Sequence, residues 1–596
     1  MGGLTRRAFL ATVAGLSAAW ALPRDAVAML LTEAAQPSDA PSTLQQTIRI
    51  GSVQKGSYRT LAPAAGEAYY PRIDLLREIP DPGRSERRRS LAYIAHLSDM
   101  HIIDAQSPAR LEPMIAQDHS LWAGCFRPQD TLTTHVGAAM VQAIAALRTS
   151  PVTGAPMSAA FVTGDSTDML SHLETRWYID LLDGTPVVPN SGRAGVYDGV
   201  QAWPEATYAY HPEDPGNDQW GTYGFPAVPG LLDAAVTQEV ASGGLPVPWF
   251  SVYGNHDVTY LGTLGVPPGL RAFAVGDRKA SEWWATAGSY VGQWAAATSV
   301  LGQVVQAATT NLGVPLGMRA VTSDPERRML ERQQFMEEHL TTSQDPGPVG
   351  HGFTPEAIAS GRTYWSTDLG PFARAFGLDT CNWVAGPDGA LPQDQLDWLT
   401  GELDRCQQEQ RLALLFSHHN SYTLENDAQL ATEPQRLVHS EEFIATMLRY
   451  PCVIAWINGH THINTITAHR REDGIGGFWE LTTASCIDFP QQQQVIDVVD
   501  NRDGSLSLFA TTLDHAGPAK WDGDLSVLGL ASLSRELSAN DWVEEPPMRL
   551  GSELDRNVEL LLPAPFDTGA YDPAVWERSR ANDVARLAAW ESGWSS

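Results

Sequence analysis

Cysteine is scarce in this chain, and the few that occur lie far apart. The 596 residues include five cysteines, Cys125, Cys381, Cys406, Cys452 and Cys486. This number and spacing exclude a small scaffold built on a disulfide framework. Two of the five could still pair in an exported protein, and the odd number leaves at least one thiol free unless two chains are joined.

Positive charge is also in short supply. The chain has 40 Lys and Arg against 70 Asp and Glu, which gives a net charge of −30. This balance argues against an electrostatic grip on nucleic acid or on anionic lipid. A negatively charged small-molecule substrate would need local positive charge, which bound metal ions can supply.

Long apolar runs are missing beyond the N-terminus, so we expect no transmembrane segment in the mature chain. The first residues contain Arg6 and Arg7, then an apolar run to Leu22 and the triplet Ala26-Val27-Ala28. These features predict a Tat-type signal peptide over residues 1–28, read by the Tat export machinery. An N-terminal membrane anchor is the alternative. The expected location is periplasmic, extracellular or at the cell envelope.

The chain is longer than one hydrophobic core usually allows, so additions to a main domain are expected. We predict an N-terminal extension over 29–90, a main domain over 91–515 and a C-terminal extension over 516–596. Insertions near 171–245 and 258–360 are rich in aromatic residues, among them Trp203 and Trp220. Such insertions either cover a site as lids or caps, or extend the packing.

Five β-rich apolar runs are each followed at once by polar residues of the kind that bind metals. They are Val247–Tyr253 before Gly254-Asn255-His256-Asp257, Leu91–Leu97 before Asp99-Met100-His101, Ala159–Thr163 before Gly164-Asp165-Ser166-Thr167-Asp168, Leu412–Phe416 before Ser417-His418-His419, and Val453–Ile457 before Asn458-Gly459-His460-Thr461-His462. Open α/β sheets place their sites at the carboxyl ends of strands, so these five ends predict one shared pocket. Carboxylate, amide and imidazole donors without thiolate suit first-row divalent or trivalent metals better than Ca²⁺ or Mg²⁺.

The order of these fragments resembles the calcineurin-like metallophosphoesterase superfamily, which includes purple acid phosphatases and cyclic-nucleotide or glycerophosphodiester phosphodiesterases. The resemblance covers roughly Leu91 to His515, and Gln395-Leu396-Asp397-Trp398-Leu399 is similar to a helix common in the superfamily. It implies an α/β fold, specifically a four-layer α/β/β/α sandwich with long insertions. It also implies a hydrolase that uses two transition-metal ions (Fe, Mn or Zn).

The same resemblance implies the site residues. One metal position, here site A, would use Asp99, His101, Asp165 and His462, and the other, site B, would use Asp165, Asn255, His418 and His460. Asp165 would bridge the two ions, and a hydroxide between them would attack phosphorus. His256 would serve as general acid or charge stabiliser, oriented by Asp257.

The sequence leaves some of these assignments open. His419 adjoins His418, and only one of the two is expected to point at the metals; the superfamily pattern favours His418. Asp168 is expected to anchor its loop, and it stands where purple acid phosphatases carry Tyr, which argues against an iron–tyrosinate site. Arg110 and the stretch Ser485–Pro490 are expected to be structural, with substrate contact as the alternative.

The expected function is hydrolysis of a phosphomonoester or phosphodiester by an exported dinuclear-metal enzyme. The main alternative is a catalytically silent envelope-binding protein that keeps the fold and binds a partner through its Trp-rich insertions. A third is a dinuclear hydrolase that acts on another kind of ester. Every expected metal ligand and His256 are present, which favours the enzyme.

Overall fold

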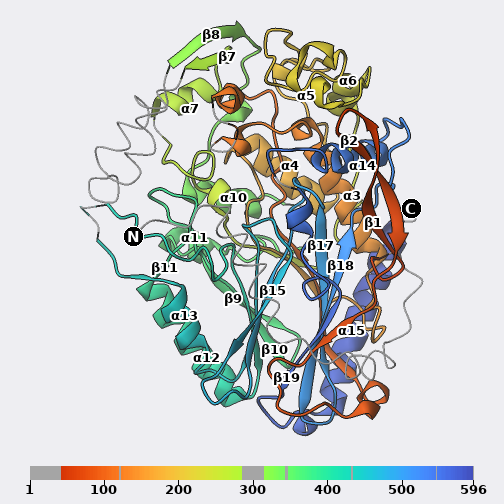
Figure 1. The fold of residues 1–596 in the computed structure, drawn as a ribbon. Coiled ribbons are helices and arrows are strands. Elements are labelled where there is room, and N and C mark those ends of the chain that lie inside the picture. Colours follow the sequence, from red (N-terminus) through yellow and green to blue (C-terminus); the bar gives the residue numbers. More distant parts are fainter. Residues whose placement is uncertain are drawn as a thin grey trace.

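The structure is a computed structural model, and it describes residues 42–594 except 118, 120, 121, 267, 285–313, 343–345, 431, 433 and 545. The predicted signal peptide, residues 1–28, lies outside the described residues. Figure 1 shows two large β-sheets side by side at the centre of the molecule, with helices on the outside. Among the described helices, none combines the length and the apolar character needed to cross a bilayer.

The first sheet has six strands in the order β15-β16-β14-β12-β10-β9. Their bounds are β9 (Trp365–Leu369), β10 (Ala373–Gly377), β12 (Leu412–Phe416), β14 (Val453–Asn458), β15 (Thr465–Arg470) and β16 (Gly477–Thr482). The four inner strands run parallel, and β9 and β15 are antiparallel edges. The residues of β12 and β14 are all buried, as expected for parallel strands covered on both faces.

The second sheet has seven strands in the order β3-β19-β18-β17-β4-β5-β6. Their bounds are β3 (Tyr70–Arg72), β4 (Arg89–Leu97), β5 (Ala159–Val162), β6 (Trp249–Ser251), β17 (Gln492–Asp500), β18 (Ser505–Asp514) and β19 (Val558–Pro563). Strands β4, β5 and β6 are parallel to one another, whereas β17 is antiparallel to β4 and β18. The sheet therefore contains strands from both predicted extensions as well as from the main domain.

A single hydrophobic core lies between the two sheets. It contains Ile94, Phe161 and Ile496 of the second sheet together with Leu414 and Phe416 of the first. The rings of Phe161 and Phe416 stack with their centroids 3.9 Å apart. Side chains on these inner faces alternate with outward-facing ones, which is how facing sheets share one core.

Helices cover the outer faces of both sheets. On the second sheet lie α3 (Thr133–Ala146), α4 (His172–Asp183) and α14 (Val527–Ser538), and on the first lie α12 (Gln393–Glu409) and α13 (Ser440–Met447). Helix α3 connects the parallel neighbours β4 and β5, as a βαβ crossover does. The predicted α/β class is therefore confirmed.

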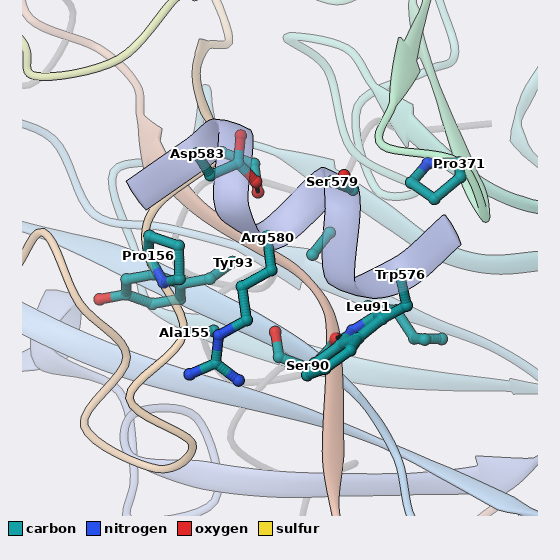
Figure 2. A pocket seen from close by; sticks show the side chains of 12 residues that line it. Ser90, Leu91, Tyr93, Ala155, Pro156, Pro371, Trp576, Ser579, Arg580 and Asp583 are labelled. Atoms are coloured by element: carbon teal, nitrogen blue, oxygen red, sulfur yellow. Dashed lines mark hydrogen bonds between the residues drawn. The ribbon is translucent and has the colours of Figure 1, made fainter. Parts of the chain in front are cut away.

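The last helix, α15 (Pro573–Trp594), crosses the second sheet beside the start of β4. Trp576 Nε1 donates to the carbonyl oxygen of Ser90 at 2.6 Å, and Figure 2 shows Trp576 and Arg580 beside Ser90. The cavity that they line measures about 20 Å³. That volume holds about one water molecule, so this end of β4 offers no room for a substrate.

Two tryptophans of the first insertion are buried inside the chain, whereas Tyr223 of the same insertion is 41% exposed. Trp203 and Trp220 are 1% and 0% exposed, in a cluster shared with α14 of the C-terminal extension. The ring of Trp220 lies 4.1 Å from that of Trp542. The insertion was expected either to cover a site or to extend the packing, and these contacts agree with an extension of the packing.

Candidate metal centre

The five predicted polar segments meet where the carboxyl ends of the parallel strands of both sheets lie close together. Strands β4, β5 and β6 lie side by side and parallel, and so do β12 and β14 in the facing sheet. Their carboxyl ends therefore deliver their polar residues to the same place. The strand predicted over Val247–Tyr253 is shorter than expected, since regular pairing spans only Trp249–Ser251. Pro248, directly before it, has no amide proton to donate, which limits the strand at its amino end.

The backbone at this edge adopts a conformation that ordinary residues avoid. Five of the seven predicted ligands have positive φ: Asp99, His101, Asp165, His460 and His462. Such non-glycine conformations cost on the order of 1–3 kcal/mol each and cluster at functional sites. A Cβ on Gly254 would lie 2.2 Å from Asp165 Oδ1, and one on Gly459 would lie 2.2 Å from Asp99 Oδ2, so these positions require glycine.

Site A collects two carboxylates and two imidazoles. His462 Nε2 lies 3.2 Å from Asp99 Oδ1 and 3.2 Å from His101 Nε2. His101 Nε2 lies 3.6 Å from Asp165 Oδ2. The outer nitrogens are held by carboxylates, since His101 Nδ1 lies 3.0 Å from Asp168 Oδ1 and His462 Nδ1 lies 2.7 Å from Asp488 Oδ2.

Site B is built around His418. Its Nε2 lies 2.9 Å from Asn255 Oδ1, 3.1 Å from His460 Nδ1 and 3.3 Å from Asp165 Oδ2. Its Nδ1 donates to the carbonyl oxygen of Thr163 at 2.8 Å. The Asn255 amide group donates to the carbonyl oxygen of Gly262 at 3.0 Å, which directs the Asn255 oxygen inward. The structure thus brings all seven predicted ligands together, with one oxygen of Asp165 near both sites.

The atoms that point into both sites suit bound cations, because hydrogen-bond acceptors face one another there without donors between them. In site B a neutral His418 ring would present a lone pair at Nε2 to the acceptor oxygens of Asn255 and Asp165. In site A, Nε2 of both His101 and His462 carry lone pairs when the outer nitrogens donate to carboxylates. Buried acceptors in such contact need a proton or a metal ion between them. Oxygen and imidazole donors suit Fe, Mn or Zn.

The pKa shifts of Asp165 and His418 also indicate that the centre suits a cation. Burial opposes ionisation of Asp165, but His418 and His256 together hold the pKa of its carboxyl well below the ordinary value. Burial also opposes a charge on His418, yet Asp165 raises its pKa to about 9. A proton therefore occupies His418 in the metal-free protein at neutral pH. A metal ion would displace that proton, so metal binding releases protons.

His256 lies beside the sites and is held by Asp168. Its Nδ1 donates to the backbone oxygen of Asp168 at 2.9 Å and lies 3.7 Å from the Asp168 carboxylate. The prediction that Asp257 orients His256 is wrong. The Asp257 carboxylate instead accepts hydrogen bonds from the backbone amides of Gly254, Ser166 and Thr167, and so holds two motif loops together.

His419 is buried with both ring nitrogens occupied by protein atoms. Its Nδ1 contacts the Thr380 hydroxyl at 3.0 Å and its Nε2 donates to the carbonyl oxygen of Pro387 at 2.9 Å. Burial and the nearby His418 lower its pKa to about 3, so the ring is neutral. Of the adjacent pair, His418 is therefore the one that presents a nitrogen to the site.

Three residues support the centre in ways that the motifs alone did not show. Asp488 holds His462, and its only signal in the sequence was its place in Ser485–Pro490, the stretch after β16. Asp168 contacts both His101 and His256. Arg110 is 1% exposed and paired with Asp168 and Asp130, which identifies it as structural.

Comparisons with known proteins give distant likenesses. No family model and no curated protein matches the chain. A dimetal phosphatase from Danio rerio aligns over 72% of this chain and 100% of its own, at 10% identity and a TM-score of 0.30. A purple acid phosphatase from yellow lupin (Lupinus luteus) seeds aligns over 80% of this chain and 67% of its own, at 10% identity and a TM-score of 0.26. At such scores, function rests on the geometry of the site.

Proposed function

We propose that this protein is a metal-dependent phosphoesterase with two metal ions, of the calcineurin-like metallophosphoesterase type. The observation that carries the proposal is the arrangement around Asp165, whose Oδ2 lies 3.6 Å from His101 Nε2 and 3.3 Å from His418 Nε2. One carboxylate oxygen is thus shared by two clusters of buried acceptors, which is how a bridging ligand is placed.

The residues of both sites fit distinct tasks. Bound at sites A and B, two Fe, Mn or Zn ions would supply a water-derived nucleophile at neutral pH and neutralise charge on the phosphoryl oxygens. Asp99, His101 and His462 would hold one ion, Asn255, His418 and His460 the other, and Asp165 both. The left-handed backbone at five of these residues keeps the donors pointed inward.

His256 fits the role of proton donor to the leaving oxygen. Because its Nδ1 donates to the Asp168 carbonyl, Nε2 is the nitrogen left to hold and deliver a proton. Its side chain is 18% exposed, whereas the Asp168 carboxyl beside it is 1% exposed, so His256 can be reached from solvent. A positioned general acid typically contributes about 10²- to 10⁴-fold in rate.

The fold proposed with this function is the four-layer α/β/β/α sandwich. Its support is the shared core between the sheets and the two outer helical layers. The main alternative, a silent partner-binding protein, draws less support, because Trp203 and Trp220 are buried and unavailable to a partner.

A substrate panel with metal-reconstituted protein tests the proposal. We expect hydrolysis of phosphomonoesters or phosphodiesters that depends on added Fe, Mn or Zn and is absent in Asp165→Ala. Carboxylic and sulfate esters in the same panel serve as controls. Turnover of those esters alone would favour a dinuclear hydrolase of another class, and no turnover with two ions bound would favour the silent protein.

Export remains part of the proposal and rests on the sequence. Fusing residues 1–28 to a reporter should give transport that requires Arg6 and Arg7. Replacing both arginines with Lys should abolish transport. A reporter that is transported but stays bound to the membrane would show that the segment is an anchor and is not cleaved. Tat carriage of a folded protein would allow metal loading before export.

A further inference from the structure

The two imidazoles of site A are connected behind the site by buried ion pairs that one backbone hydrogen bond joins. Asp168, which holds His101, receives Nη1 of Arg110 at 2.5 Å. Asp488, which holds His462, receives Nε of Arg127 at 2.7 Å. The two arginines thus stand in equivalent positions, one behind each carboxylate.

Asp130 joins the two halves. Its Oδ2 accepts from Nη2 of Arg110 at 2.8 Å and from the backbone amide of Arg127 at 3.2 Å. Arg110, Arg127 and Asp130 are 1%, 5% and 2% exposed, so water screens none of these charges effectively. We call these three residues the charged belt. All three come from the irregular segment between β4 and α3.

The belt closes a ring around site A. From His101 the contacts run through Asp168, the belt and Asp488 to His462, and the two Nε2 atoms meet again at 3.2 Å. Arg549 of the C-terminal extension adds a further contact, with Nη1 3.3 Å from Asp488 Oδ2. Each ring is thereby fixed with its inner nitrogen directed at the same point.

Site B has no matching support among the described residues. The outer nitrogen of His418 donates to a neutral carbonyl oxygen, that of Thr163, rather than to a carboxylate. Charge-assisted hydrogen bonds are roughly twice as strong as neutral ones, and a carboxylate behind an imidazole raises its basicity as a ligand. Site A also contains two carboxylates, Asp99 and Asp165, whereas site B pairs Asp165 with the neutral amide of Asn255.

We propose that the charged belt positions the site A histidines and makes site A the tighter of the two metal sites, with Asp130 as the residue that couples its two halves. The inference rests on the proposed dinuclear centre. Arg110, Asp130 and Arg127 are positioning residues, since they act on the metal through Asp168 and Asp488. In the metal-free protein the belt keeps site A assembled, while site B relies on its own ligands.

The test measures metal retention while purified protein is dialysed against rising concentrations of chelator. Wild-type protein should lose its ions in two steps, with site B emptying first. In Asp130→Asn the second step should move to lower chelator concentration, by up to the about 10- to 100-fold in affinity that is typical when a group in contact with a ligand is lost. The first step should stay in place.

Two matched variants serve as controls. Asp497→Asn removes a buried carboxylate held by the hydroxyls of Ser90, Ser150 and Thr153, with no link to the belt, and should leave both steps unchanged. Arg127→Lys keeps the charge behind Asp488 and should retain site A better than Arg127→Met. If Asp130→Asn fails to fold, the Arg127 pair carries the test by itself.

Assignment of the affected site uses Asn255→Ala, in which the remaining ion occupies site A. Adding Asp130→Asn to that variant should weaken the remaining ion by the same factor. Equal shifts of both steps, or no shift in Asp130→Asn and in Arg127→Met, would overturn the belt. Wild-type protein that retains no metal would instead contradict the proposed centre itself.

Discussion

At the scale of single residues, His256 and Asn255 are neighbours with different surroundings. The Asn255 oxygen faces His418 inside site B, whereas the His256 ring donates a hydrogen bond to the carbonyl oxygen of Asp168. Substitutions at the two positions therefore test the proposed proton donation separately from the proposed metal binding.

His256→Ala should keep both metals and lose most activity towards alkyl phosphate esters, whose leaving oxygen needs a proton. The loss should be much smaller towards nitrophenyl esters, because those groups depart unprotonated; the difference reflects a general-acid contribution of about 10²- to 10⁴-fold. Asn255→Ala is the matched comparison and should weaken one metal and depress both rates alike. Hydrolysis rates on the two esters, measured together with metal content, show whether His256 donates a proton. Equal losses on both esters for His256→Ala would show that the residue only stabilises charge.

The residues that meet at the centre could be predicted from the sequence, but the residues behind them could not. Each of them lies within four residues of the carboxyl end of a strand, so local pattern locates it. Asp488 and Asp130 reach the site only through long-range contacts, with His462 in one case and Arg110 in the other. The assignment of Asp257 failed for the same reason, since adjacency in sequence did not reveal that its carboxylate caps backbone amides.

At the scale of elements, the strands that carry the site followed from their apolar runs. Strand β12 matches the predicted range Leu412–Phe416, and β4 begins two residues earlier than expected. Strands β3 and β19 were not predicted, because the parallel pairing of Val558 with Tyr70 joins segments nearly five hundred residues apart. Pairing over such a separation leaves no local signal.

Strand β17 offers a prediction about pH. Burial raises the pKa of Asp497 to about 6, above the ordinary carboxyl value, despite three hydroxyl donors. The folded state then binds the proton more tightly than the unfolded state, so stability conferred by the protonated form is lost as pH rises through about 4 to 6. Between about pH 4 and about pH 8 wild type should lose up to about 3 kcal/mol of unfolding free energy relative to Asp497→Asn.

Urea unfolding of metal-free wild type and Asp497→Asn at both pH values measures this difference. Metal-free protein is used so that loss of metal at low pH does not contribute. A stability difference between the two proteins that is the same at both pH values would show that Asp497 stays ionised when folded.

At the scale of the whole molecule, both terminal extensions belong to the body that holds the site. Strands β3 and β19 complete the second sheet, and Arg549 contacts Asp488. The first insertion packs on the C-terminal extension through Trp220 and Trp542. The chain therefore surrounds a centre assembled from residues that lie between Asp99 and His462.

Metal content per chain tests the central claim most directly. Protein purified without added metal should contain about two transition-metal ions, as a bridged dinuclear site requires. Asp165→Ala should lose both ions together, because one oxygen of Asp165 serves both sites, while Asp497→Asn should keep both. Elemental analysis of the three proteins gives the answer. A wild-type content near zero, a tightly held Ca²⁺, or an Asp165→Ala variant that retains both ions would contradict the account.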